Sequence, residues 1–244
     1  MSSAVESHVV ERIAAAPVLR EPFPHCLIDG IFSAEFYESI IDHWPGAESW
    51  EPLSESGRVR GYEERLVVLM NDRGFARLDG ARRAFWKDEI AAWLQTERFR
   101  AQVLGKFRAE LEESGFGASP RESIGDALIV SDRTNYAIGP HTDAPHRAVT
   151  LLFYLPEDDT FRRFGTSFYA PLDGAFRCHG GPHHPFERFR RVKTAEFVPN
   201  RLLMFPKSDR CFHGVERVDL PGIDRRLLIY NVRRTGGAPR QPLK

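Results

Sequence analysis

Three residues with metal-binding side chains stand in two separate parts of the sequence. His141 and Asp143 belong to the motif His-Thr-Asp, and His213 follows far downstream in Cys-Phe-His-Gly-Val. Side chains at positions i and i+2 of a β-strand leave the same face, so His141 and Asp143 could bind one ion from a single strand. A facing strand could supply His213 as the third ligand. This pattern predicts a metal centre whose remaining coordination positions are open for chemistry.

Two adjacent arginines, Arg225 and Arg226, follow His213 and precede an apolar run at 227–230. A guanidinium binds a carboxylate through two parallel hydrogen bonds, so an arginine here predicts a site for an organic acid. Neighbouring residues of a strand point to opposite faces, and the spacing favours Arg225 as the inward one. Two imidazoles and one carboxylate around a partly open metal are typical of non-haem Fe(II) oxygenases.

With these motifs in this order, the sequence resembles the Fe(II)/2-oxoglutarate-dependent dioxygenases of the prolyl-hydroxylase-like branch. The resemblance covers roughly residues 20–233 and rests on the His-x-Asp motif, on His213 with the Gly-Val that follows it, and on the arginine that begins the next strand. It implies that His141, Asp143 and His213 hold Fe(II) and act in catalysis. It also implies 2-oxoglutarate as co-substrate and O2 as oxidant.

Within that resemblance, the co-substrate carboxylate is expected on Arg225, with Arg226 as the alternative. Family members usually show Arg-x-Ser at this point, whereas Leu227 stands at the third position here. The serine hydroxyl that often helps to hold the co-substrate carboxylate is therefore missing. Tyr136 stands where the family often has a phenol or an amide that bonds the co-substrate. The other interpretation of Tyr136 is an aromatic ring packed on the barrel wall.

The implied reaction is hydroxylation of an unactivated C–H bond, with release of succinate and CO2. Related halogenases lack the metal-binding carboxylate, so Asp143 favours hydroxylation or desaturation over halogenation. A small-molecule substrate ranks slightly above a peptidyl one. The alternative from another class of protein is a non-catalytic jelly-roll binding module with a vestigial metal site.

The elements that must position these residues are short strands in the second half of the chain. Apolar runs separated by Pro, Gly, Asn and Asp turn signals predict strands at 126–131, 134–138, 148–155, 166–169, 192–198, 202–205 and 225–232. Strands of this number and length predict a closed β-sandwich or barrel. With the family resemblance, the expected fold is mainly β with flanking helices (α+β), built on a double-stranded β-helix, or jelly roll.

The first half of the chain predicts helices that cover one side of this core. Ser33, Asp79 and Thr96 precede apolar residues at helical spacing and are expected as N-caps. The predicted organisation is an N-terminal leader or helix at 1–20 and a single dioxygenase domain at 21–233. Within that domain we expect a helical flank at 33–115 and the β-helix core at 124–233, before a disordered tail at 234–244.

Composition narrows the possible partners. The 34 basic and 34 acidic residues give a formal net charge of zero, so no overall field recruits nucleic acid or an anionic membrane. Three cysteines cannot pair completely, and no apolar run reaches the length of a membrane span. We therefore expect a cytoplasmic protein with no nucleic-acid or membrane partner. The sequence carries no signal of its oligomeric state.

Two further stretches invite alternative interpretations. The cluster at 178–184 holds one cysteine and three histidines, but no second cluster completes a four-ligand zinc site. A loop near the substrate entrance, with His183 or His184 touching substrate, is the favoured interpretation. The stretch 158–191 carries several arginines, among them Arg162, Arg163, Arg188, Arg190 and Arg191. They predict a solvated insertion or, as the alternative, a basic rim that prefers an anionic substrate.

Overall fold

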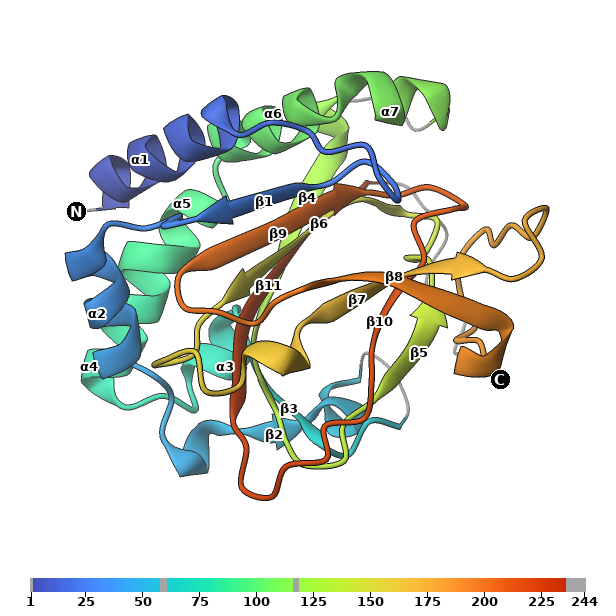
Figure 1. Ribbon diagram of the computed structural model, residues 1–244. Coiled ribbons are helices and arrows are strands. Elements are labelled where there is room, and N and C mark those ends of the chain that lie inside the picture. The colour runs from blue at the N-terminus through green and yellow to red at the C-terminus, as the bar shows by residue number, and fades with distance from the viewer. Residues whose placement is uncertain (1, 58–60, 116–118, 236–244) are drawn as a thin grey trace.

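Two antiparallel sheets face one another, and helices lie along the outer side of the larger sheet (Figure 1). This computed structural model describes residues 2–57, 61–115 and 119–235. The strands are β1 (Cys26–Asp29), β2 (Glu51–Pro52), β3 (Arg65–Leu69), β4 (Ser123–Asp132), β5 (Ile138–His141), β6 (Arg147–Tyr154), β7 (Thr166–Pro171), β8 (Phe189–Ala195), β9 (Arg201–Pro206), β10 (His213–Val215) and β11 (Arg225–Arg234). The larger sheet has the order β1-β9-β6-β11-β4-β3-β2, and the smaller sheet has the order β5-β10-β7-β8.

The strands β4 to β11 follow the path of a jelly roll. The chain crosses between the sheets at nearly every step, placing β4, β6, β9 and β11 in the larger sheet and β5, β7, β8 and β10 in the smaller one. Along β11, Leu227 and Ile229 pack toward the space between the sheets, while Leu228 and Tyr230 pack toward the helices. The larger sheet is therefore buried on both faces. This arrangement confirms the predicted double-stranded β-helix with flanking helices.

The helices are α1 (Ser2–Ala15), α2 (Ala34–Asp42), α3 (Asp72–Phe75), α4 (Gly80–Ala84), α5 (Ala92–Leu94), α6 (Glu97–Lys106) and α7 (Arg108–Glu113). The side chains of Ser33, Asp79 and Thr96 each accept a hydrogen bond from the backbone N–H three residues later, as N-caps do. None of the helices among the described residues is long and apolar enough to cross a membrane.

Both ends of the described chain pack against the rest of the protein, and the N-terminal residues form a helix, one of the two alternatives predicted for them. In α1, Val9 and Ile13 are fully buried, so the first helix contributes to the core that covers the larger sheet. At the other end, β11 continues to Arg234, and the backbone N–H of Thr235 donates to the Glu122 carbonyl. The rest of the tail expected at 234–244 lies outside the described residues.

Several predicted boundaries are wrong. The strand expected at 134–138 is a turn, because Asn135 has a φ of 73°, in the left-handed region, and β5 begins only at Ile138. The strand expected at 192–198 lies earlier, as β8. The helix that begins after Thr96 ends at Lys106, with α7 following after Phe107. The helix that begins after Asp79 continues into a π-helical segment at Phe85–Ala91.

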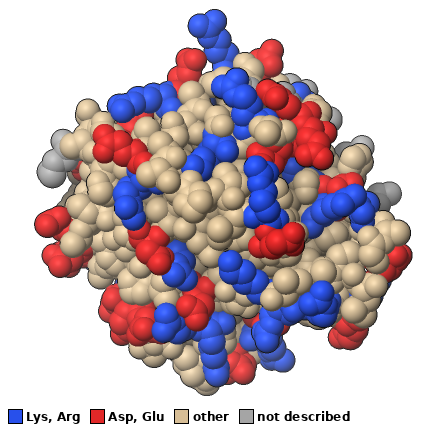
Figure 2. Space-filling model, turned by 45° about the horizontal axis from the view of Figure 1, so that its top comes forward, with Lys and Arg blue, Asp and Glu red and all other residues tan. Residues whose placement is uncertain are grey.

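The surface agrees with a net charge of zero. On the face shown in Figure 2, basic and acidic side chains are intermixed over the whole surface.

All three cysteines are free and buried.

Candidate metal centre

The three predicted metal ligands meet at one end of the smaller sheet. β5 ends at His141, β10 begins at His213, and the antiparallel register places these two residues opposite each other. Asp143 lies just beyond the end of β5, so it reaches the site from a loop rather than from the strand as predicted. One ligand atom from each of the three side chains lies within 4.8 Å of the other two, and all three residues are buried. This spacing fits a single metal ion.

The two imidazoles are held so that the same nitrogen of each ring is free. Nδ1 of His141 lies 2.9 Å from the Gly139 carbonyl, and Nδ1 of His213 lies 2.9 Å from the Cys211 carbonyl. A carbonyl oxygen only accepts a hydrogen bond, so each Nδ1 carries the proton and donates it. Nε2 of each ring keeps its lone pair for a metal.

The charges of the three side chains suit a divalent cation. Burial lowers the pKa of His141 well below its ordinary value and also lowers the pKa of His213, which keeps both imidazoles neutral. Burial alone would raise the pKa of Asp143, but the positive charge of Arg147 and the hydrogen bond from Thr150 act in the opposite direction, and the pKa lies below its usual range. Two neutral imidazoles and one ionised carboxylate are the protonation states that metal binding requires.

Neighbouring side chains fix the orientation of Asp143. Arg147 donates to Oδ1 at 2.7 Å, and the Thr150 hydroxyl is 2.7 Å from Oδ2. Thr150 Oγ1 also lies 3.1 Å from Oδ1 of Asn231, on β11. None of these three partners was singled out from the sequence, because only the folded register brings β6 and β11 beside the loop that carries Asp143. Each oxygen of Asp143 keeps a lone pair for a metal.

The Cys/His cluster at 178–184 lies along the ligand strand without forming a second metal cluster. The backbone N–H of His184 donates to the Pro140 carbonyl at 2.9 Å, and the Thr142 hydroxyl donates to the Cys178 carbonyl at 2.8 Å. The His183 ring lies 4.5 Å from that of His141, and its Nδ1 contacts the hydroxyl of Tyr62. In the part of the chain that the structure describes, only the triad brings three such ligand atoms together.

The two predicted carboxylate-binding arginines point to opposite sides of β11. Arg226 pairs with Asp224 at 2.9 Å and Glu157 at 2.6 Å on the outer side. Arg225 is 1% exposed and points into the space between the sheets. Its guanidinium donates to the Phe164 carbonyl at 2.6 Å and to Asp132 at 2.7 Å. Of the two arginines, therefore, only Arg225 has its guanidinium in the interior.

The surroundings of Arg225 supply hydroxyl and aromatic groups from other strands. Its Nη2 lies 3.5 Å from the hydroxyl of Thr166, on β7. Thr166 thus supplies a hydroxyl near Arg225, which Leu227 cannot supply. Its guanidinium carbon lies 5.8 Å from the ring centre of Tyr154 and 5.0 Å from that of Phe197. These neighbours could not be predicted from the sequence, since the segments that carry them are far from Arg225 along the chain.

Tyr136 lies beside the same group of residues and is completely buried. Burial raises the pKa of its phenol, which therefore stays protonated and able to donate. The hydroxyl has no hydrogen-bond partner among the described residues. The guanidinium of Arg65, on β3, lies 4.3 Å from the centre of the Tyr136 ring. The packed ring agrees with the interpretation of Tyr136 as a core aromatic, and a bond from its hydroxyl to a co-substrate stays a prediction.

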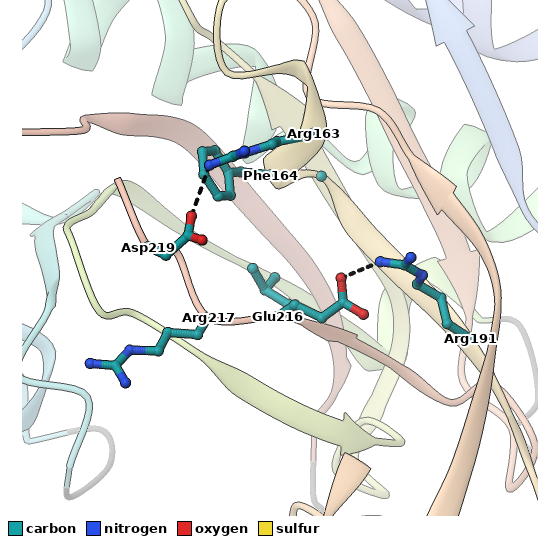
Figure 3. Close-up of a pocket in the computed structure, with 8 residues that line it drawn as sticks. Arg163, Phe164, Arg191, Glu216, Arg217 and Asp219 are labelled. Carbon is teal, nitrogen blue, oxygen red and sulfur yellow. Dashed lines mark hydrogen bonds and ion pairs between the residues drawn. The ribbon is translucent and has the colours of Figure 1, made fainter. Parts of the chain in front are cut away.

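A surface cavity of about 330 Å³ lies beside β10, and none of the three triad residues lines it (Figure 3). Its lining includes Arg163 and Arg191, two of the arginines of the predicted basic rim. Arg163 pairs with Asp219 at 2.9 Å and Arg191 pairs with Glu216 at 2.5 Å. Acidic partners thus neutralise both arginines, as in a solvated, ion-paired surface.

Comparisons with known proteins find likeness in structure alone: no protein-family model and no curated protein matches the chain. A prolyl-4-hydroxylase from Pseudomonas putida is 15% identical with a TM-score of 0.49, over 94% of this chain and 100% of that one. An oxidoreductase of the 2OG-Fe(II) oxygenase family from Burkholderia pseudomallei is 15% identical with a TM-score of 0.48, over 96% and 94%.

A third similar structure comes from Micromonospora carbonacea var. aurantiaca and is a complex with 2-oxoglutarate. It is 11% identical with a TM-score of 0.47, over 96% of this chain and 92% of that one. These similarities concern the course of the chain, and no substrate of this protein follows from them.

Proposed function

We propose that this protein is an Fe(II)- and 2-oxoglutarate-dependent dioxygenase. It hydroxylates an unactivated C–H bond of a small molecule, or of a peptidyl substrate as second choice, and releases succinate and CO2. The observation that supports this proposal best is the buried set of two neutral imidazoles and one ionised carboxylate, with ligand atoms within 4.8 Å of one another. Such a set holds an iron on one side and leaves positions for an oxo-acid and oxygen.

The residues of the triad fit Fe(II), and their roles are to bind and orient it. His141 and His213 offer Nε2, because their Nδ1 atoms are committed to backbone carbonyls. Arg147 and Thr150 hold the carboxylate of Asp143. When bound, the iron and 2-oxoglutarate supply the oxidising power with O2, while the protein supplies geometry, a dry site and the position of the target bond.

Arg225 is proposed to hold the distal carboxylate of 2-oxoglutarate. Arg225 and Asn231 leave the same face of β11, and Asn231 connects to the metal ligand Asp143 through Thr150. Leu227 and Ile229 lie between them on that face and exclude water. The distal carboxylate of a metal-bound oxo-acid would thus have a buried cation on its own side of β11. The free hydroxyl of Tyr136 is a further donor for the co-substrate.

A reducing compartment such as the cytoplasm belongs to the same proposal. The three cysteines are free, and a reducing environment would also keep iron ferrous. The formal net charge of zero lends no support to nucleic acid as a partner.

Succinate formation from 2-oxoglutarate, Fe(II) and O2 in the absence of a prime substrate tests the proposal. The wild type should form succinate slowly, and His141→Ala should abolish this activity. The exposed His179 provides a matched control, and His179→Ala should retain the wild-type rate. The vestigial binding module predicts instead that metal binds and no succinate forms. Full activity of His141→Ala would contradict the assignment.

A further inference from the structure

One buried carboxylate, that of Asp132, is shared by two arginines from neighbouring strands. The register places Arg65 of β3 and Arg225 of β11 on either side of Asp132, at the end of β4. Arg65 donates to Oδ1 through Nε at 2.6 Å and to Oδ2 through Nη2 at 3.0 Å. Arg225 donates to the same Oδ2 through Nη1 at 2.7 Å. The three side chains therefore form one hydrogen-bonded unit.

The charges of this unit do not cancel. Asp132 is fully buried, Arg225 is 1% exposed and the Arg65 side chain is 14% exposed. Two guanidiniums and one carboxylate leave one net positive charge. An unpaired charge in a protein interior is unfavourable, and the cost falls when an anion binds beside it. The unpartnered hydroxyl of Tyr136, beside Arg65, is a neutral donor for that anion.

Arg225 alone could not offer this charge. Without Arg65, the ion pair between Arg225 and Asp132 would be neutral, and Asp132 would compete with any incoming carboxylate. Arg65 binds Asp132 through two nitrogens and so takes up the charge of that carboxylate. Arg225 uses three of its five N–H groups on Phe164, Asp132 and Thr166, and two remain for a ligand.

We infer that Arg65 is a positioning residue for the co-substrate. By neutralising Asp132, it leaves the charge of Arg225 available to a single carboxylate. The inference rests on the proposed function, because the carboxylate it concerns is the distal one of 2-oxoglutarate. It adds that affinity depends on the net charge of the Arg65–Asp132–Arg225 unit and not on Arg225 alone.

Calorimetric titration of Zn(II)-loaded protein with 2-oxoglutarate tests the role of Arg65 in co-substrate affinity without turnover. In Arg65→Gln, the charges of Asp132 and Arg225 cancel, and the Kd for 2-oxoglutarate should rise on the order of ten-fold or more. In Arg65→Gln/Asp132→Asn, Arg225 stands alone and the net charge is again positive. The double variant should therefore recover to within about three-fold of the wild-type Kd.

A shortened ligand and a matched variant separate this role from a general loss of structure. 2-Oxobutanoate lacks the distal carboxylate, so its Kd should change by less than about two-fold in Arg65→Gln. Arg163→Gln removes an exposed, ion-paired arginine and should leave both ligands unaffected. Thermal unfolding of each variant shows whether it folds.

The results distinguish failure of this inference from failure of the proposed function. A wild-type Kd in Arg65→Gln, or a double variant no better than Arg65→Gln, overturns the inference while the proposed function stands. Absence of 2-oxoglutarate binding by the Zn(II)-loaded wild type overturns both. If Arg65→Gln does not fold, the double variant decides, because its net charge is that of the wild type. Loss of binding in a folded double variant then contradicts the inference.

Discussion

His213 lies directly opposite His141 across the β5–β10 pair, with ring centres 4.4 Å apart. The antiparallel register thus converts two distant parts of the sequence into one pair of facing imidazoles. Backbone carbonyls two residues before each histidine fix the Nδ1 proton, and the loop after β5 adds the carboxylate of Asp143. One ligand atom of each of the three side chains lies within 4.8 Å of the other two.

Arg225→Ala should raise the 2-oxoglutarate concentration needed for half-maximal succinate formation by ten-fold or more, on the order expected for loss of a charged hydrogen bond. Arg226→Ala is the matched control, because it removes the neighbouring arginine from the outer side of the same strand. Steady-state measurement of succinate at varied 2-oxoglutarate checks both. The opposite ranking of the two variants would mean that the other face of β11 binds the co-substrate.

Thr150→Val should weaken metal binding by about 10- to 100-fold, as loss of an outer-shell partner usually does. The hydroxyl that orients Asp143 and connects it to Asn231 is lost, while the side chain keeps its shape. Thr194→Val, which removes a hydroxyl paired with Ser167, is the control. Competition with a metal indicator measures the affinity. Equal affinity in Thr150→Val and Thr194→Val would show that Thr150 does not tune the site.

Asp132→Asn should lower the free energy of unfolding by about 3–5 kcal/mol, because two guanidiniums lose the carboxylate between them in a buried position. Asp29 also pairs with an arginine, Arg201, but its side chain is 68% exposed. Asp29→Asn should therefore cost only about 0–1 kcal/mol. Urea unfolding of the metal-free variants gives both values. Similar losses in the two variants would contradict the role assigned to burial.

Because of His25, the free energy of unfolding should fall as the pH is lowered into mild acid. Burial lowers the pKa of His25 and Lys193 lowers it further, against the hydrogen bond between Nδ1 and the Phe23 carbonyl. As the pH falls below about 6.5, the unfolded chain therefore binds a proton that folded His25 does not. The free energy of unfolding should fall more steeply between pH 7.5 and 5.5 in the wild type than in His25→Gln. Parallel pH profiles would show that His25 does not contribute.

The convergence of His141, Asp143 and His213 and the inward direction of Arg225 could be predicted from residue type and order along the chain together with the family resemblance. The jelly roll followed from the spacing of apolar runs together with the family resemblance. Asp143 was placed on a strand because alternation alone does not show where pairing ends. The strand expected at 134–138 was wrong because Asn135 adopts a left-handed conformation that propensity does not reveal.

The Arg65–Asp132–Arg225 unit could not be predicted from the sequence. Arg65 begins an apolar run and Asp132 ends one, which are ordinary places for charged residues. Only the pairing of β3 and β11 with β4 brings the three side chains together, and that register depends on packing across both faces of the sheet. Thr150 and Asn231 were missed for the same reason.

Anaerobic titration with Fe(II) tests the central claim most directly. The wild type should bind a single ion per chain at the triad. His213→Ala should lose affinity by more than the about 10- to 100-fold that an outer-shell partner contributes, while His179→Ala should bind as the wild type does. Tight binding of one ion by His213→Ala would contradict the claim that these three side chains share one metal.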